Sequence, residues 1–97
     1  DGSMKKAAIL IKADGTMRGI YPSNGSDFSL KELQGFVHGL IEIVTLTSNA
    51  IMVINEEGKF TQPSNPTATV IAKALYSIRY DDYIAGDVLM CPNYMVK

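Results

Sequence analysis

The chain has 97 residues and a formal net charge of −1, from 9 basic and 10 acidic residues. Asp1, Gly2 and Ser3 resemble the remnant of an expression tag, so we take residues 4–97 as a single α+β domain. Without Asp1 the charges balance, which excludes a global field that favours nucleic acid or an anionic membrane. Cys91 is the only cysteine, so an intramolecular disulfide is excluded and a reducing cytoplasm is expected.

The first two strands are predicted to form a hairpin. Residues 7–11 are an apolar run that is too short to span a membrane. Asp14-Gly15 follows it, and this dipeptide is typical of a tight two-residue hairpin turn. Residues 16–21 are therefore expected to form the returning strand.

A helix is predicted to follow at residue 30. Ser29 and Glu32 have the spacing of a capping box, in which each side chain accepts a hydrogen bond from the other residue's backbone amide. Gly39 is expected to end the helix as a left-handed C-cap. One face of this helix is apolar and carries Leu30, Leu33, Phe36 and Val37.

A second hairpin and a second helix are predicted next. Residues 40–46 and 50–54 are apolar strands joined by a polar turn, and residues 55–58 form the following turn. Residues 59–65 show no periodicity and are expected to be irregular. Asn65 is placed to cap a helix that starts at Pro66 and extends to about residue 79. The inner face of this helix is expected to carry Ala68, Ile71, Ala72, Leu75 and Ile78.

The last strand covers residues 88–91, which gives the order β-β-α-β-β-α-β. A mixed, mainly antiparallel sheet is expected, and this order is compatible with a β-grasp-like arrangement. The strands at 7–11, 50–54 and 88–91 are apolar without a break, which predicts burial on both faces of the sheet. If both helices lay on one face, the other face would have to meet another subunit or a ligand, so a homodimer through a sheet face is one expectation.

The sequence has little that points to catalysis. His38 is the only histidine, and its expected place at a helix C-terminus, where the dipole favours a cation, suffices to explain it. Cys91 lies in an apolar strand, where a buried thiol is inert. Glu56-Glu57 and Asp81-Asp82 lie in predicted turns and are interpreted as solvated charges. We therefore predict a protein that is not an enzyme and has no cofactor and no metal site.

One segment and one hairpin could contact nucleic acid. Tyr76, Arg79, Tyr80 and Tyr83 interleave aromatic and basic side chains, a pattern found where single strands stack on proteins. Asp81 and Asp82 lie inside that segment and would repel phosphate. The alternative hypothesis is thus a nucleic-acid or nucleotide binder, whose contacts would be Lys5, Lys6, Lys12, Arg18, Arg79 and Tyr80.

Several motifs together resemble a family of small bacterial and phage proteins. The motifs are Tyr21-Pro22, Phe28-Ser29-Leu30, Glu32-Leu33-Gln34, Ile41-Glu42-Ile43-Val44, Asn55-Glu56-Glu57-Gly58-Lys59 and Gly86-Asp87-Val88-Leu89. The family is known as a domain of unknown function in phages, plasmids and conjugative elements. The resemblance implies a cytoplasmic host and supplies no reaction. This chain has His38-Gly39 where the family pattern has Gly-Gly.

The first function hypothesis is a non-enzymatic binding or accessory protein of a phage or mobile element. It would act through contact with a host or element protein, or with a small ligand, because the sequence has doubly buried strands and balanced charge. Turns held by a rigid sheet are where binding usually occurs. The ligand-binding residues predicted on this basis are Tyr21, Asn55, Glu56, Glu57 and Asn65.

Overall fold

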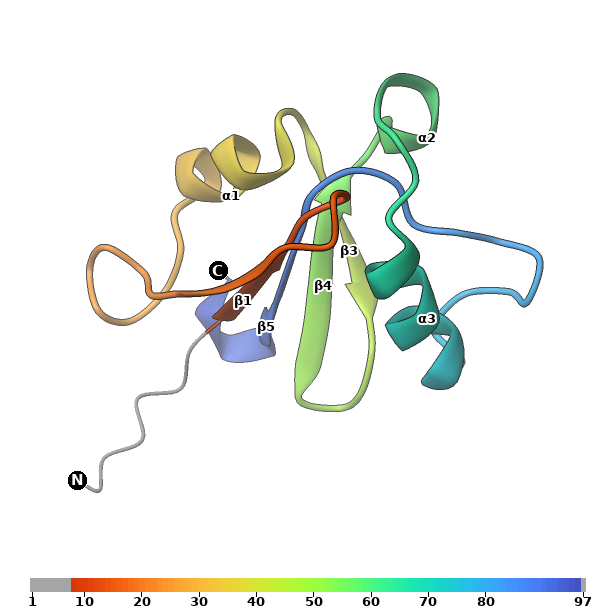
Figure 1. Ribbon diagram of the computed structural model, residues 1–97. Helices are drawn as coiled ribbons and strands as arrows, with labels where there is room; N and C mark the ends of the chain where they lie inside the picture. Colours follow the sequence, from red (N-terminus) through yellow and green to blue (C-terminus); the bar gives the residue numbers. More distant parts are fainter. Residues whose placement is uncertain (1–7, 97) are drawn as a thin grey trace.

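The structure is a computed structural model that describes residues 8–96, and its sheet has helices on both faces (Figure 1). The elements are β1 (Ala8–Ile11), β2 (Met17–Ile20), α1 (Leu30–Val37), β3 (Ile41–Thr45), β4 (Ala50–Asn55), α2 (Gly58–Thr61), α3 (Pro66–Ala74), β5 (Val88–Pro92) and the short 3-10 helix η1 (Asn93–Met95). The five strands are ordered β2-β1-β5-β4-β3, and each neighbouring pair is antiparallel. The predicted α+β class and the order β-β-α-β-β-α-β are confirmed, with α2 as an additional element. No helix within residues 8–96 is long and apolar enough to cross a membrane.

The last strand joins the two hairpins into one sheet. β5 lies between β1 and β4, with Leu10 opposite Leu89 and Val53 opposite Leu89 on its other side. The upper end of the sheet in Figure 1 is where β1 and β4 end, and the lower end is where they begin. We use upper end and lower end in this sense below.

Two apolar cores explain why the strands have no polar alternation. The core on the α1 face consists of Ala8, Leu10, Phe28, Leu33, Val37, Ile51, Val53, Leu89, Cys91 and Met95. The core on the α3 face consists of Ile11, Leu46, Met52, Ala68, Ala72, Ile84 and Val88. The strands β1, β4 and β5 contribute alternate residues to the two cores, as period-two side chains must. The condition under which a sheet-face homodimer was expected, with both helices on one face, is therefore not met. A β-grasp fold has its helix across one face of the sheet, whereas this sheet has helices on both faces.

The first hairpin turn is longer than predicted. Gly15 N–H donates to the Lys12 carbonyl at 3.0 Å, and Lys12 N–H donates to the Thr16 carbonyl at 2.8 Å. These bonds enclose a three-residue loop, and Gly15 has a φ of +94°. The two-residue prediction was wrong because a type I turn followed by a left-handed glycine also uses Asp-Gly, with one residue more.

Helix α1 begins as predicted and ends one residue early. The capping box is present: Glu32 N–H donates to Ser29 Oγ at 3.1 Å, and Ser29 N–H donates to Glu32 Oε1 at 2.9 Å. The left-handed residue, however, is His38 with a φ of 67°, and not Gly39. Gly39 is needed for another reason, since a Cβ there would lie 2.9 Å from the Asn55 side-chain nitrogen.

Helix α3 is shorter than predicted, and α2 was not predicted. The sequence suggested a helix to about residue 79, but α3 ends at Ala74 because Tyr76 is left-handed with a φ of 55°. Tyr76 N–H donates to Lys73 O at 3.0 Å and Ser77 N–H to Ala72 O at 2.8 Å, the pattern of a Schellman motif. Residues 58–61 form α2, although residue 58 was expected to end a turn and residues 59–61 to be irregular. One helical turn is too short to show periodicity.

Two hydrogen bonds fix α3 diagonally across its face of the sheet. At its start, Asn65 Nδ2 donates to the carbonyl of Ile11 at the upper end of β1, at 3.0 Å. Just after its end, Ser77 Oγ donates to the carbonyl of Leu46 at the lower end of β3, at 3.4 Å. A diagonal between these two points leaves the lower corner of the face, over β1 and β5, without a helix.

Candidate functional site

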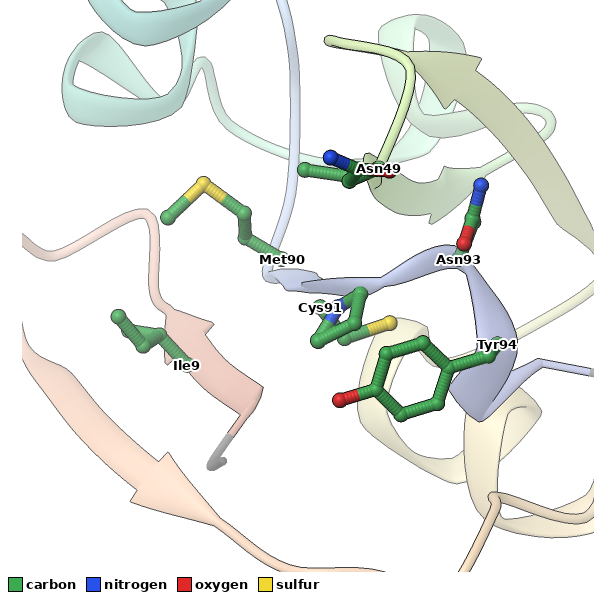
Figure 2. A pocket seen from close by; sticks show the side chains of 8 residues that line it. Ile9, Asn49, Met90, Cys91, Asn93 and Tyr94 are labelled. Atoms are coloured by element: carbon green, nitrogen blue, oxygen red, sulfur yellow. The ribbon is translucent and has the colours of Figure 1, made fainter. Parts of the chain in front are cut away.

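The uncovered lower corner is hollowed into a groove of about 550 Å³ (Figure 2). Its floor comes from β1, β5 and the start of β4, and its rim from η1. It is lined by Ile9, Asn49, Ala50, Met90, Cys91, Pro92, Asn93 and Tyr94. Most of these side chains are apolar, and a volume of this size falls in the range of small-molecule sites, about 300–1,000 Å³.

Ile9 and Met90 make the apolar floor of the groove. They are directly opposite each other in the β1–β5 register, and both belong to the margin of the α3-face core. Both are only partly buried, whereas Ile11 and Val88, one step toward the upper end, are completely buried. Figure 2 shows the Ile9 and Met90 side chains, from neighbouring strands, bordering the same opening. Here the core of this face lacks a covering element.

The rim residue Tyr94 is held in place by its two neighbours. Asn93 Nδ2 donates to the Ser48 carbonyl at 3.0 Å, and Asn93 N–H donates to the Asn49 carbonyl at 2.9 Å. On the other side Met95 is buried in the α1-face core. Tyr94 itself is 57% exposed. A short anchored helix thus presents an aromatic ring with a phenol at the edge of an apolar groove, an arrangement suited to binding.

Cys91 offers the groove no nucleophile. Burial raises the pKa of its thiol to about 11, so the thiolate is scarce at neutral pH. His38 is also far away, since it contacts Asp87, four residues before Cys91 on a strand that advances about 3.3 Å per residue. A Cys-His dyad is thereby excluded. The groove is lined mostly by apolar side chains and can bind an apolar group.

Two of the predicted binding residues are parts of the framework. Asn65 is fully buried: its Oδ1 accepts from Ala68 N–H at 3.0 Å, and its Nδ2 donates to the carbonyls of Ile11 and Gly86. Asn55 is 7% exposed, and it donates from Nδ2 to the Val37 carbonyl at 2.9 Å. These amides connect loops, and neither faces solvent where a ligand could reach it.

The other three predicted binding residues are exposed but do not gather. Glu56 and Glu57 follow β4 at the upper end of the sheet, and Glu57 precedes α2. Tyr21 follows β2 at the lower end, on the opposite side of the sheet from β4. Glu56 lines a small hollow of about 190 Å³ between β3, β4, α2 and the segment that precedes β5. The five residues therefore do not form one site.

The residues of the nucleic-acid hypothesis are dispersed as well. Lys5 and Lys6 lie outside the described residues. Lys12 and Arg18 are exposed on the first hairpin, and Tyr80 is 86% exposed beyond α3. Arg79 is paired with Asp81 at 3.3 Å. The Tyr76–Tyr83 segment also carries Asp82, which pairs with Lys59, and Lys59 lies 5.2 Å from the centre of the Tyr83 ring.

A contact between His38 and Asp87 was not predicted. His38 Nε2 lies 3.0 Å from Asp87 Oδ2, and Asp87 Oδ1 accepts from Ala13 N–H at 2.9 Å. Three upper-end loops therefore meet at one carboxylate. His38 and Asp87 are 49 residues apart in the chain, and only the folded structure brings them together. No three His, Cys, Asp or Glu side chains among residues 8–96 gather so that they could hold a metal.

Asp87 is expected to make stability depend on acid pH. Burial alone would raise its pKa, but the hydrogen bonds from Ala13 and His38 lower the pKa below its ordinary value of 3.8. A lowered pKa means that the stabilisation is complete above pH 3.8 and is lost as the pH falls through the folded-state value. Asp87→Asn should therefore show a shallower loss of unfolding free energy below that pH than the wild type, measured by urea denaturation. An identical slope would contradict this.

Comparison with known proteins identifies a family. The family model described as a domain of unknown function, DUF3846, matches residues 4–94. Neither the comparison with curated proteins nor the comparison with solved structures finds a match. Because the match includes both hairpins, both longer helices and β5, the chain belongs to the DUF3846 family.

Proposed function

We propose that this protein is a non-enzymatic, cytoplasmic accessory protein of a phage or mobile element that binds a small apolar ligand in the groove at the lower end of its sheet. The cellular context rests on the resemblance of its motifs to phage and plasmid proteins. The binding role rests on the fold and on the groove.

One observation carries the proposal: an apolar part of the α3 face of the sheet is open at Ile9 and Met90. The centre of the same face is covered, since Ile11, Met52 and Val88 are completely buried there. Covering apolar side chains with an apolar ligand removes their surface from water, which is favourable by about 25 cal/mol for each Å² covered. An apolar ligand would gain this free energy and could place a polar group near Asn49 or Tyr94 at the rim.

Two features favour this role over the alternatives. The described basic residues are scattered, and Arg79 already pairs with a carboxylate, so no continuous cationic surface attracts phosphate. The buried thiol of Cys91 and the solvent-exposed His38 lie at different ends of β5. Nucleic-acid binding and catalysis are therefore less well supported than the binding of a ligand in the groove.

The experiment is a fluorescence titration with the neutral apolar dye phenylnaphthylamine. Met90→Lys brings a charge into the groove, and its long side chain can extend to water, so the fold should be kept. Met17→Lys is the matched control, because Met17 is 51% exposed on β2 at the upper end of the same sheet face. We expect the wild type and Met17→Lys to bind the dye equally and Met90→Lys to bind it about tenfold more weakly, a change of about 1.4 kcal/mol.

Two results would reject the proposal. One is a wild-type protein that gives no saturable fluorescence change. The other is equal affinity in Met90→Lys and Met17→Lys, which would place the dye elsewhere. Circular dichroism of each variant shows whether a loss of binding is a loss of folding.

A further inference from the structure

The outer edge of β3 has backbone groups that no described strand pairs. Leu46 N–H donates to the Ala50 carbonyl at 3.0 Å and Glu56 N–H donates to the Leu40 carbonyl at 2.8 Å, so the even-numbered residues from 40 to 46 bond to β4. In an antiparallel pair the alternate residues point their N–H and C=O groups the other way. Ile41, Ile43 and Thr45 therefore present donors and acceptors to the outside, where β3 is the last strand of the described sheet.

β3 has only one of the sequence features that normally prevent strand addition, the charge of Glu42. The other edge, β2, has four residues and includes Arg18 and Gly19, a charge and a poor strand former. β3 has five residues with the sequence Ile-Glu-Ile-Val-Thr, and it contains no proline, glycine, lysine or arginine. Ile43 at its centre is 41% exposed. Exposed apolar edges of this kind are templates for pairing with another chain.

We propose that β3 pairs with β3 of a second copy of this chain, antiparallel and centred on Ile43. In this register Ile43 faces Ile43 of the partner subunit, and Ile41 faces the partner subunit's Thr45, so all outward N–H and C=O groups of these residues are paired. Glu42 faces the partner subunit's Val44. The edge is thus complementary to itself, as a twofold axis requires.

The neighbouring registers are less favourable, which is why a second copy fits in one way. A shift that centres the pair on Glu42 places the two carboxylates opposite each other, and like charges in that position are destabilising. A shift that centres it on Val44 leaves Ile41 without a partner. The inference is independent of the groove, because the groove lies over β1 and β5 and β3 is the far edge of the sheet.

Single cysteine variants test the register. A hydrogen-bonded antiparallel pair has its Cα atoms about 5.5 Å apart, inside the roughly 4.4–6.8 Å that a disulfide needs. Ile43→Cys should therefore form a covalent dimer under mild oxidation. Thr45→Cys should remain uncrosslinked, since its symmetry mate lies roughly 14 Å away at the rise of an antiparallel strand. The native Cys91 is buried and contributes little background.

Light scattering tests the dimer without crosslinking. The expected wild-type mass is twice the chain mass of 10.6 kDa. Ile43→Pro removes an outward N–H that makes no bond to β4, and edge strands tolerate such a proline. We expect circular dichroism to be unchanged and the dimer dissociation constant to rise about tenfold, as the loss of one or two hydrogen bonds implies. Met17→Lys, at the other edge, should not change it.

Three results would overturn the proposal: a wild-type monomer at every accessible concentration, equal crosslinking of Ile43→Cys and Thr45→Cys, or a dimer that Met17→Lys dissociates and Ile43→Pro does not. If Ile43→Pro fails to fold, the two cysteine variants decide, since neither changes the backbone. A protein that stays monomeric and instead pairs β3 with a strand of a different protein would also overturn the proposal.

Discussion

Replacing Asn65 with alanine is expected to lower the free energy of unfolding by about 3–5 kcal/mol, the sum of a lost helix cap and buried carbonyls left unpaired. The Asn65 side chain accepts from Ala68 N–H and donates to the carbonyls of Ile11 and Gly86. It therefore joins α3, β1 and the segment before β5. A domain of this size has roughly 5–15 kcal/mol in total, so the variant should lose a large part of its stability.

Asn49→Ala is the matched control for this prediction. Asn49 is exposed, and the bonds it makes in its turn come from the backbone. Surface substitutions of this kind change stability by about 0.5 kcal/mol or less. Urea denaturation followed by circular dichroism measures both variants. If Asn65→Ala were as stable as Asn49→Ala, the buried amide would not hold the three segments together.

The second large effect is expected at Gly58, where alanine should destabilise the protein by about 1–3 kcal/mol, as overpacking does. Gly58 is buried at the start of α2, and a Cβ there would lie 2.9 Å from the backbone carbonyl oxygen of Ala85. That oxygen belongs to a segment that also bridges to Ser64, so it cannot move without disturbing the entry to α3.

Gly35→Ala is the matched comparison, and its expected effect on stability has the opposite sign. Gly35 lies in α1 on the exposed side, its backbone is not left-handed, and a Cβ there would meet nothing within 4 Å. Gly35→Ala should therefore stabilise the protein by about 0.5–1 kcal/mol through helix propensity. Thermal unfolding of the two variants gives the comparison. A Gly58→Ala variant that unfolds above the wild-type temperature would show that Ala85 does not approach as described.

Local signals in the sequence predicted most elements of the fold. The capping box at Ser29 and the cap at Asn65 were predicted because each depends on residues within one helical turn. The helix ends were not predicted, because His38 and Tyr76 adopt left-handed conformations that glycine usually takes. His38 also contacts Asp87, which lies far along the chain and so could not be paired with it from local sequence.

The candidate site was much harder to predict than the fold. Asn55 and Asn65 were selected as polar residues near turns, and the same amide chemistry that suits a ligand instead satisfies buried carbonyls. The groove combines Ile9 with Met90, which are distant in the sequence and adjacent only because β5 lies beside β1. Its openness depends on the diagonal path of α3, which follows from the bonds at Asn65 and Ser77.

Methionine-methyl NMR spectroscopy of the protein with phenylnaphthylamine tests the central claim most directly. Only the methyl groups of the five methionines need to be isotope-labelled. If the groove is the binding site, the Met90 methyl signal should shift progressively and saturate with the dye, while the signal of Met17, at the other end of the same face, should stay in place. A Met90 signal that does not move while the dye binds, or a larger shift at Met17, would contradict a binding function at this groove.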